Sequence, residues 1–332
     1  MEIDFVILWV DGNDPKWQEE LFQYLQKSDE DKCKTYFRDW DNLHYIFRAF
    51  EQFTPWVRKI HFVTWGHLPA WLNTHHPKLN IVKHKDILNT ENLPVFNSNA
   101  IEPSLYRIQD LSEKFVLFND DFFITTPLQK ERFFKNGLPC DSLVSNALSS
   151  SSGVGHFVLN NIEIINRYYS KRESIFSHPI QWFHYKYGMD MFRNIALLPW
   201  SRFTGFVDPH QPQPFLKSTF EEVWDKEKKV LEKTSASKFR NCTDVNQYLF
   251  RYWQLAKGEF MPTSMKDTKY ITMNMTNLRN GEVTKGIVSR KFAMLCLNDS
   301  EEIQTEDEFK EAKKIIQEAF EKILPAKSAF EL

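Results

Sequence analysis

The sequence predicts an α/β fold built on a mostly parallel, doubly wound sheet, and three observations support this prediction. Short apolar runs typical of strands recur at residues 3–10, 59–64, 79–83 and 114–118. Helical or turn-like sequence separates these runs, and such alternation is typical of a parallel sheet covered on both faces. With 332 residues, 42% of them hydrophobic, the chain is long enough for one large α/β domain or two smaller ones.

The first strand and the first helix are each bounded by a clear signal. Residues 3–10 are almost continuously apolar, as in a strand buried on both faces, and they end at the turn-forming residues 11–15. From residue 41, apolar residues recur at three- and four-residue spacing until Pro55, which predicts an amphipathic helix. Its apolar positions are Leu43, Ile46, Phe47, Phe50 and Phe53.

The C-terminal half is predicted to add helices to this sheet. Residues 223–232 and 243–255 have helical patterns. A further helix is expected to begin at Thr305, where Glu308 completes a capping box. Its apolar stripe is expected to pack on the same domain, with docking to a membrane or partner as the alternative. The stripe comprises Phe309, Ala312, Ile316, Phe320 and Ile323.

We therefore expect residues 1–300 to form a single catalytic α/β domain and residues 301–332 to form a C-terminal amphipathic helix. Residues 130–200 give a weak signal, and we interpret them as an insertion, a lid or an acceptor-binding region. Within them, residues 145–155 are rich in Ser and Gly. That composition suits an active-site loop and a plain linker equally.

The charge balance excludes one large class of partner. Lys and Arg number 42 and Asp and Glu number 44, which leaves a formal net charge of −2. A protein that holds a nucleic-acid backbone by releasing counterions needs a basic face. We therefore expect no nucleic-acid partner.

The sequence also predicts a cytoplasmic protein without a transmembrane segment. The opening residues carry no basic, apolar leader, and no apolar run there approaches the roughly 18 residues that cross a bilayer. Cysteines that lie far apart are typical of reduced thiols in a cytosolic protein, and peripheral attachment to the inner face of the cytoplasmic membrane is compatible with this reading. The four cysteines are Cys33, Cys140, Cys242 and Cys296.

Polar side chains follow the fourth predicted strand, and ligands of such sheets bind beyond the carboxyl ends of the strands. Asp120 and Asp121 come directly after residues 114–118 and Asn119. Adjacent carboxylates at a strand end point in different directions, so one can ligate a divalent cation while the other holds a hydroxyl. Mg²⁺ held by carboxylates is usually completed by phosphates, which favours a nucleotide diphosphate as the ligand. A capped turn is the structural alternative.

A second group follows the first strand and suits a nucleoside. A ring or free backbone can lie against the base, and a carboxylate can bind the ribose hydroxyls. A tight turn capped by Asp and Asn is the alternative. The group comprises Trp9, Val10, Asp11, Gly12 and Asn13.

Two further blocks contain an arginine suited to phosphate, because the planar guanidinium donates two hydrogen bonds at once. Arg38, Asp39 and Asn42 precede the first helix. Asn97 opens the other block, which Arg107 follows. A surface salt bridge is the alternative for either arginine.

These blocks resemble the conserved regions of the Stealth family of sugar-phosphate transferases. Residues 9–15, 38–64 and 97–121 are similar to the first two regions, and residues 201–253 and 291–299 to two later ones. The family includes bacterial capsule polysaccharide phosphotransferases and the animal N-acetylglucosamine-1-phosphotransferase. The resemblance implies transfer of a hexose 1-phosphate from a UDP-sugar to an acceptor hydroxyl, with release of UMP. It also implies a Rossmann-like fold similar to the GT-A nucleotide-sugar transferases.

The resemblance also implies a metal site and a catalytic histidine. Asp120 and Asp121 match the acidic pair expected at the metal and the donor phosphate, with Mg²⁺ or Mn²⁺ on Asp121 and Asp299. His210 matches the histidine expected to act in catalysis, and its ordinary pKa of about 6.5 suits a base for the acceptor hydroxyl.

Arg240 and Asp244 match an arginine and an acid of the same region as this histidine. Arg240 is expected to neutralise charge on the transferred phosphoryl oxygens. Gln213 stands near the position at which members of the family often have a second histidine, so a two-histidine scheme does not carry over.

The expected partners are a UDP-sugar donor and a saccharide acceptor that is either free or lipid-linked. UDP-GlcNAc, UDP-GalNAc and UDP-Gal all remain open as donors, because they differ by single polar groups that the sequence does not distinguish. One alternative is a glycosyltransferase that transfers the sugar and releases UDP. The other is a non-catalytic carbohydrate-binding protein that uses the abundant aromatic rings as stacking platforms.

Overall fold

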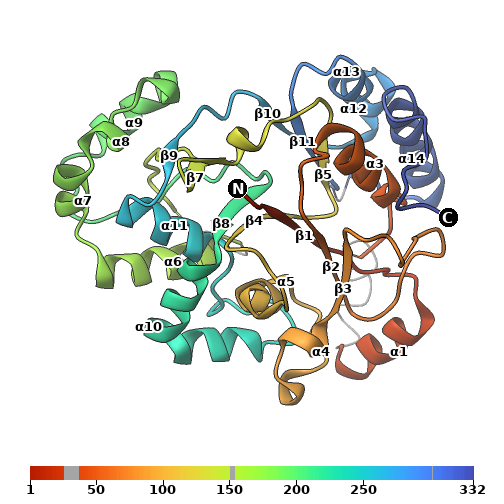
Figure 1. Cartoon of the computed structure of the whole chain (residues 1–332), viewed down its shortest axis with the longest axis horizontal. Helices are drawn as coiled ribbons and strands as arrows, with labels where there is room; N and C mark the ends of the chain where they lie inside the picture. Colours follow the sequence, from red (N-terminus) through yellow and green to blue (C-terminus); the bar gives the residue numbers. More distant parts are fainter. Residues whose placement is uncertain (26–36, 150–153, 301) are drawn as a thin grey trace.

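The centre of the molecule is a five-stranded sheet. A computed structural model describes residues 1–25, 37–149, 154–300 and 302–332, and Figure 1 shows the arrangement of the whole chain. The strand order is β3-β2-β1-β4-β8, with β1 to β4 parallel and β8 antiparallel at the edge. The strands span Asp4–Leu8 (β1), Ile60–Thr64 (β2), Leu79–Lys83 (β3), Lys114–Phe118 (β4) and Gln213–Leu216 (β8). The four predicted strands and their parallel pairing are thus confirmed.

Helices cover both faces of this sheet, because successive side chains of each strand point to opposite sides. Phe5 and Ile7 of β1 lie in one buried cluster and Val6 lies in the other. Helices α3 (Leu43–Phe53) and α14 (Glu306–Glu321) pack in the first cluster. The second cluster holds α5 (Ser98–Ile101), α10 (Lys217–Ser235) and α11 (Tyr248–Lys257).

A second, three-stranded sheet brings the C-terminal part of the chain to the end of β4. Its order is β10-β11-β5, with β5 (Phe122–Ile124) antiparallel to β11 (Met294–Asn298) and β10 (Thr268–Thr272) parallel to β11. Phe122 pairs with Cys296. Since β5 begins four residues after β4 ends, this register carries Cys296 toward the carboxyl edge of the central sheet.

The remaining elements surround this core. A small third sheet contains β6 (Phe134–Lys135), β7 (Leu138–Asp141) and β9 (Met261–Pro262). In the described part of the chain, the other α-helices are α1 (Pro15–Tyr24), α4 (His84–Ile87), α6 (Val154–Tyr168), α7 (Lys171–Ser177), α8 (Pro179–Trp182), α9 (Met191–Ala196), α12 (Met275–Arg279) and α13 (Glu282–Val288). Short 3₁₀ helices span Thr90–Asn92, Glu102–Arg107, Lys130–Arg132 and Tyr185–Asp190.

The predicted helices are confirmed with changed boundaries. The pattern at 223–232 lies inside the longer α10, and α11 begins at Tyr248 rather than near residue 243. The helix begins later than expected because residues 241–244 form a turn, in which the Asp244 amide donates to the Asn241 carbonyl. Thr305 and Glu308 do form the capping box of α14.

The stripe of α14 packs on its own domain, as expected. Ala312, Ile316 and Phe320 are fully buried, and the Phe320 ring lies 4.5 Å from that of Phe123 in β5. Residues 145–155 extend into a segment outside the described residues, so the choice between loop and linker is not addressed there. Among the described residues, the helices are too short or too polar to cross a membrane.

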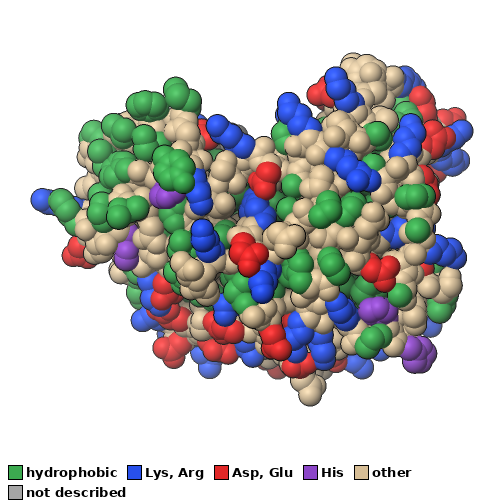
Figure 2. Space-filling model, turned by 45° about the horizontal axis from the view of Figure 1, so that its top comes forward, with side chains coloured by type: hydrophobic (Ala, Val, Ile, Leu, Met, Phe, Trp, Pro, Cys, Tyr) green, Lys and Arg blue, Asp and Glu red, His purple; other side chains and the backbone are tan. Residues whose placement is uncertain are grey.

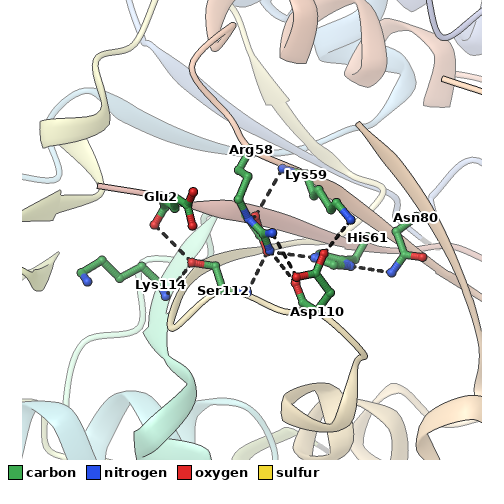
Figure 3. A network of polar contacts seen from close by, with 9 residues as sticks. Glu2, Arg58, Lys59, His61, Asn80, Asp110, Ser112 and Lys114 are labelled. Atoms are coloured by element: carbon green, nitrogen blue, oxygen red, sulfur yellow. Dashed lines mark hydrogen bonds and ion pairs between the residues drawn. The ribbon is translucent and has the colours of Figure 1, made fainter. Parts of the chain in front are cut away.

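A buried polar network ties the amino ends of the central strands together (Figure 3). Asp4 accepts hydrogen bonds from Arg58 Nε at 2.8 Å and from the Ser112 amide at 2.8 Å, and it lies 2.9 Å from His61 Nε2. The other ring nitrogen of His61 contacts Asn80 at 2.9 Å. Burial alone would raise the pKa of Asp4, but the bonds from His61 and Arg58 hold it below its usual value. This network lies at the edge opposite to the site described next and stabilises the sheet.

Candidate active site

The predicted polar residues meet at the carboxyl edge of the central sheet. Strand β1 has β2 and β3 on one side and β4 on the other, so the chain changes direction across the sheet between β1 and β4. Ligands of open α/β sheets bind at this switch point. Asp11 follows β1, and Asp120 and Asp121 follow β4.

Several acids lie close enough there to perturb one another. Asp120 is exposed, but the protein around its carboxyl group and the negative charges of Asp121 and Asp39 raise its pKa to about 7. Burial and the charges of Asp41 and Asp11 also raise the pKa of Asp39. Like charges gathered in this way favour a bound cation.

His210 lies beside this acidic group. Its Nε2 is 3.7 Å from Asp121 Oδ2, and its ring packs edge-on between Phe122 and Tyr270, each with its ring centroid 5.3 Å away. About a third of the histidine side chain remains exposed. The histidine is therefore oriented by a carboxylate and two rings and still accessible to a substrate.

Cys296 completes this group, and the sequence prediction did not include it. Its Sγ donates to Asp121 Oδ2 at 3.1 Å, and ligand-type atoms of Asp121, His210 and Cys296 lie within 4.8 Å of one another. Burial, followed by the charge of Asp121, raises the pKa of the Cys296 thiol far above its usual value, so the thiol stays protonated. Asp121 Oδ1 is buried without a hydrogen-bond partner among the described residues.

The loop that carries His210 is anchored to helix α11. His210 has a positive φ of 41°, in a region that residues other than glycine enter rarely. Two residues earlier, Asp208 accepts hydrogen bonds from Arg251 Nη1 at 2.9 Å and Tyr252 Oη at 2.6 Å. Arg251 is fully buried and also forms a two-bond pair with Asp141. Helix α11 therefore fixes the base of the His210 loop.

The loop after β1 is held by His67 and by a close approach of the backbone. The Asp11 amide donates to His67 Nε2 at 2.7 Å, and the Asn13 amide donates to Asp11 Oδ1 at 2.9 Å. A Cβ on Gly12 would lie only 1.8 Å from the carbonyl oxygen of Phe37. Glycine is thus required where this loop packs against the backbone of Phe37.

Two aromatic and apolar residues of this loop face the protein interior. Trp9 is buried and stacks on Phe62 with centroids 5.5 Å apart, so the ring supports the sheet and offers no open face to a nucleobase. Val10 is half-buried against the small cluster around Trp17. Asn13, by contrast, is exposed.

Arg38 and Asp299 bind each other. Both oxygens of Asp299 accept from the Arg38 guanidinium, and Trp40 Nε1 donates to Asp299 Oδ2 at 3.1 Å. Arg38 also donates to the Ile303 carbonyl at 2.9 Å. The Asp299 carboxylate is thus occupied by a cation of the protein itself, and its role as a metal ligand stays a prediction.

Asp244 and Asn97 also bind each other rather than facing outward. Asp244 accepts from Asn97 Nδ2 at 3.0 Å, from Ser237 Oγ at 2.7 Å and from the Asn241 amide at 2.9 Å. This carboxylate therefore anchors the loop that carries Arg240. Arg240 itself is exposed.

Glu102 is a buried acid near the charges of Arg240 and His210 and was not among the predicted residues. It is buried and accepts from the Gln247 amide at 3.1 Å. Burial raises the pKa of Glu102, and the nearby positive charge of Arg240 and that of His210 oppose this shift. The signal for Glu102 was its place at the end of the polar block that begins at Asn97.

Two predicted residues stand apart from this group. Arg107 donates to the Ile87 carbonyl at 3.3 Å and lies over the Trp224 ring at 4.6 Å. These contacts hold neighbouring elements of the fold together. Asn42 is buried directly before α3, and its side-chain oxygen has no partner in the described chain.

A histidine and several carboxylates gathered beyond the ends of parallel strands define an α/β enzyme. Sequence comparison narrows this class. Residues 1–29 match the description "Stealth protein CR1, conserved region 1", and residues 36–140 match "Stealth protein CR2, conserved region 2".

Similar proteins extend this match to the whole chain. The chain is 40% identical over 340 residues to the capsular polysaccharide phosphotransferase WcwK of Streptococcus pneumoniae. The aligned region covers 99% of this chain and 98% of that protein. It is 38% identical over 339 residues to the receptor polysaccharide phosphotransferase WefC of Streptococcus oralis, with 100% and 99% covered. The chain belongs to the Stealth family and is a phosphotransferase.

Solved structures resemble the chain only distantly. The glycosyltransferase GlyE of Streptococcus pneumoniae TIGR4 has a TM-score of 0.39 and 10% identity, over 99% of this chain and 66% of that one. This similarity is too weak to inform the site, and the α/β assignment rests on the sheet order described above.

Proposed function

We propose that this phosphotransferase moves a hexose 1-phosphate from a UDP-sugar to a hydroxyl of an acceptor saccharide in bacterial capsule or cell-surface polysaccharide synthesis. The names of the similar proteins support phosphotransfer in polysaccharide synthesis. The observation that carries the proposal is the contact of His210 with Asp121 beside Asp120, at the sheet edge where nucleotides bind.

The proposed reaction is an in-line displacement at the phosphorus that carries the sugar. The acceptor oxygen forms a bond to this phosphorus while the phosphoanhydride bond to UMP breaks, and UMP leaves with the electron pair. The His210 imidazole takes the acceptor proton, and the Asp121 carboxylate, which lies beside its Nε2, orients the ring. Arg240 is exposed and suited to neutralising the phosphoryl oxygens.

We propose that Mg²⁺ or Mn²⁺ binds through Asp120 and Asp121. Carboxylate oxygens suit these hard cations, the mutual repulsion of the acids favours a cation, and Asp121 Oδ1 is buried and unpartnered in the described chain. When bound, such a cation would offset the charge of the donor diphosphate.

We assign the donor nucleoside to the loop of Asp11, Gly12 and Asn13, because the Asn13 side chain is exposed there and the backbone is fixed. UDP-GlcNAc, UDP-GalNAc and UDP-Gal are the candidate donors, and the acceptor is a free or lipid-linked saccharide. A cytoplasmic location agrees with a nucleotide-sugar donor and with the free thiols of Cys140, Cys242 and Cys296.

Nucleotide product analysis tests this proposal. The purified chain is incubated with each UDP-sugar, acceptor oligosaccharide and Mg²⁺, and the products are separated by ion-exchange chromatography. Release of UMP together with a phosphodiester-linked product is expected. Release of UDP would instead identify a glycosyltransferase, and saccharide binding without turnover would identify a binding protein.

A further inference from the structure

A stretch of short helices turns large apolar side chains toward solvent. More than half of each of six such side chains between α7 and Arg202 is exposed, and we call them the apolar face: Phe176, Ile180, Tyr185, Met189, Phe192 and Trp200. Figure 2 shows hydrophobic side chains gathered on the upper left of the molecule, over α7 to α9. Patches of this kind mark sites of interaction.

The inner side of the same stretch is fixed by buried contacts. Trp182 and Asn194 are fully buried, and Asn194 Nδ2 donates to the carbonyls of Leu143 at 2.9 Å and Trp182 at 2.7 Å. Lys171 Nζ donates to the carbonyls of Leu197 and Trp200. These hydrogen bonds fix the inner side of the stretch against the rest of the protein. The apolar face on its other side is therefore exposed to solvent.

The charge of this stretch is opposite to that of the whole chain. Residues 171–202 hold five Lys or Arg against two acids, but Lys171 is buried and Lys186 is half-buried, so the exposed charges are three arginines against Glu173 and Asp190. Arg172, Arg193 and Arg202 are exposed around the apolar face. The surface is therefore apolar with arginines around it, and this combination is complementary to anionic headgroups above a hydrocarbon layer.

We propose that the apolar face docks this protein on the surface of an anionic phospholipid bilayer. Tyr185 and Trp200 suit the headgroup level, and Ile180, Met189 and Phe192 suit the acyl boundary. A second copy of the chain is a poorer occupant, because a two-fold contact would set the same basic side chains against each other. The short helices would lie on the membrane and not cross it.

Docking would also hold the His210 loop close to the bilayer. Lys186 Nζ donates to the Pro262 carbonyl at 3.0 Å, and Gln211 Nε2, next to His210, contacts Met265 Sδ at 2.9 Å. The stretch and the catalytic loop are thus fastened to the same segment. A lipid-linked acceptor would then meet the active site at the membrane, a point that rests on the proposed function.

Vesicle flotation of the full chain tests the docking. The wild type is expected to float with vesicles of phosphatidylcholine and phosphatidylglycerol, less with phosphatidylcholine alone, and less as salt is raised. Ile180→Ser with Met189→Ser is expected to weaken binding at least tenfold. The matched control, Phe22→Ser with Val288→Ser, changes two exposed apolar residues elsewhere and is expected to bind like the wild type.

A second pair of variants addresses the charges. Arg172→Gln with Arg202→Gln is expected to weaken binding to anionic vesicles and to flatten its salt dependence. Absence of wild-type binding to anionic vesicles, or unchanged binding by the Ile180→Ser/Met189→Ser variant, would overturn the docking proposal. So would a dimer in sedimentation that this variant disrupts, because the face would then join two copies.

Activity with a soluble acceptor separates this proposal from the proposed function. UMP release by the Ile180→Ser/Met189→Ser variant on a soluble acceptor is expected to equal that of the wild type, since neither residue lies among those placed at the active site. Loss of flotation with retained UMP release supports docking. Retained flotation with retained UMP release leaves the transferase function intact and overturns docking through this face.

Discussion

Asp121 Oδ2 lies 3.7 Å from His210 Nε2 and accepts a hydrogen bond from Cys296 at 3.1 Å. Strand β4 delivers the aspartate, the loop before β8 delivers the histidine, and β11 delivers the cysteine. Three distant parts of the chain therefore meet at one carboxylate. That carboxylate serves two tasks in the proposed reaction, because one oxygen faces the histidine and the other is free of protein partners in the described chain.

Removal of the His210 imidazole is expected to abolish most turnover. General-base catalysis contributes roughly 10²–10⁴-fold to rate, so His210→Ala should lower kcat by about that factor while the protein stays folded. UMP release measured at saturating donor checks this, with the exposed His75→Ala as the matched control. A kcat within twofold of the wild type would exclude His210 as the base.

Chelation is expected to stop the reaction if a hard cation binds at Asp120 and Asp121. Activity should disappear in EDTA and return with excess Mg²⁺ or Mn²⁺, and Asp121→Ala should remain inactive at any metal concentration. Asp307→Ala, which removes an exposed acid in α14, should behave like the wild type. Full UMP release in chelator would remove the metal from the proposed mechanism.

The Cys296 thiol is expected to resist alkylation. Its raised pKa, caused by burial and by Asp121, keeps the thiolate population small at pH 8. Iodoacetamide should therefore modify the exposed Cys242 well before Cys296, as followed by peptide mass spectrometry. Equal rates at the two cysteines would contradict a protonated thiol bonded to Asp121.

The sequence allowed prediction of the sheet and of several site residues. It did not allow prediction of the side chains to which these residues are hydrogen-bonded. Uninterrupted apolar runs identify buried strands, and polar residues directly after them must lie at one edge. Long-range partners leave no such local signal: nothing near Asp299 indicates that Arg38 occupies it, and nothing near Asp244 indicates Asn97. Trp9 illustrates the same limit. The sequence around a tryptophan at a strand end does not show whether its ring stacks on a core residue such as Phe62 or on a bound nucleobase.

The Asp4 network is expected to make stability depend on pH in the acid range. The folded-state pKa of Asp4 is lowered, so its contribution is fully present above the unfolded value of about 3.9 and is lost as pH falls through the folded value. Asp4→Asn removes this contribution and should cost about 3–5 kcal/mol near pH 7, as for breaking a buried ion pair. Urea unfolding should show the gap to the wild type shrinking below about pH 4. A gap that stays constant down to pH 3 would contradict this assignment.

Asp208 is expected to position His210 without touching substrate. It accepts from Arg251 and Tyr252, and this anchor holds the following loop in which His210 adopts its unfavourable positive φ. Asp208→Asn keeps the shape and weakens the bond to Arg251, so kcat should fall by about tenfold with little change in KM, since a displaced base affects the chemical step. Tyr252→Phe removes one hydrogen bond and should have a smaller effect.

A double mutant distinguishes positioning from a separate catalytic role. If Asp208 acts through the histidine, Asp208→Asn should cause no further loss in the His210→Ala background, because the group that it positions is already gone. An additional tenfold loss there would show that Asp208 acts on the reaction by another route. Unfolding midpoints of all four proteins, measured in urea, control for a general loss of structure.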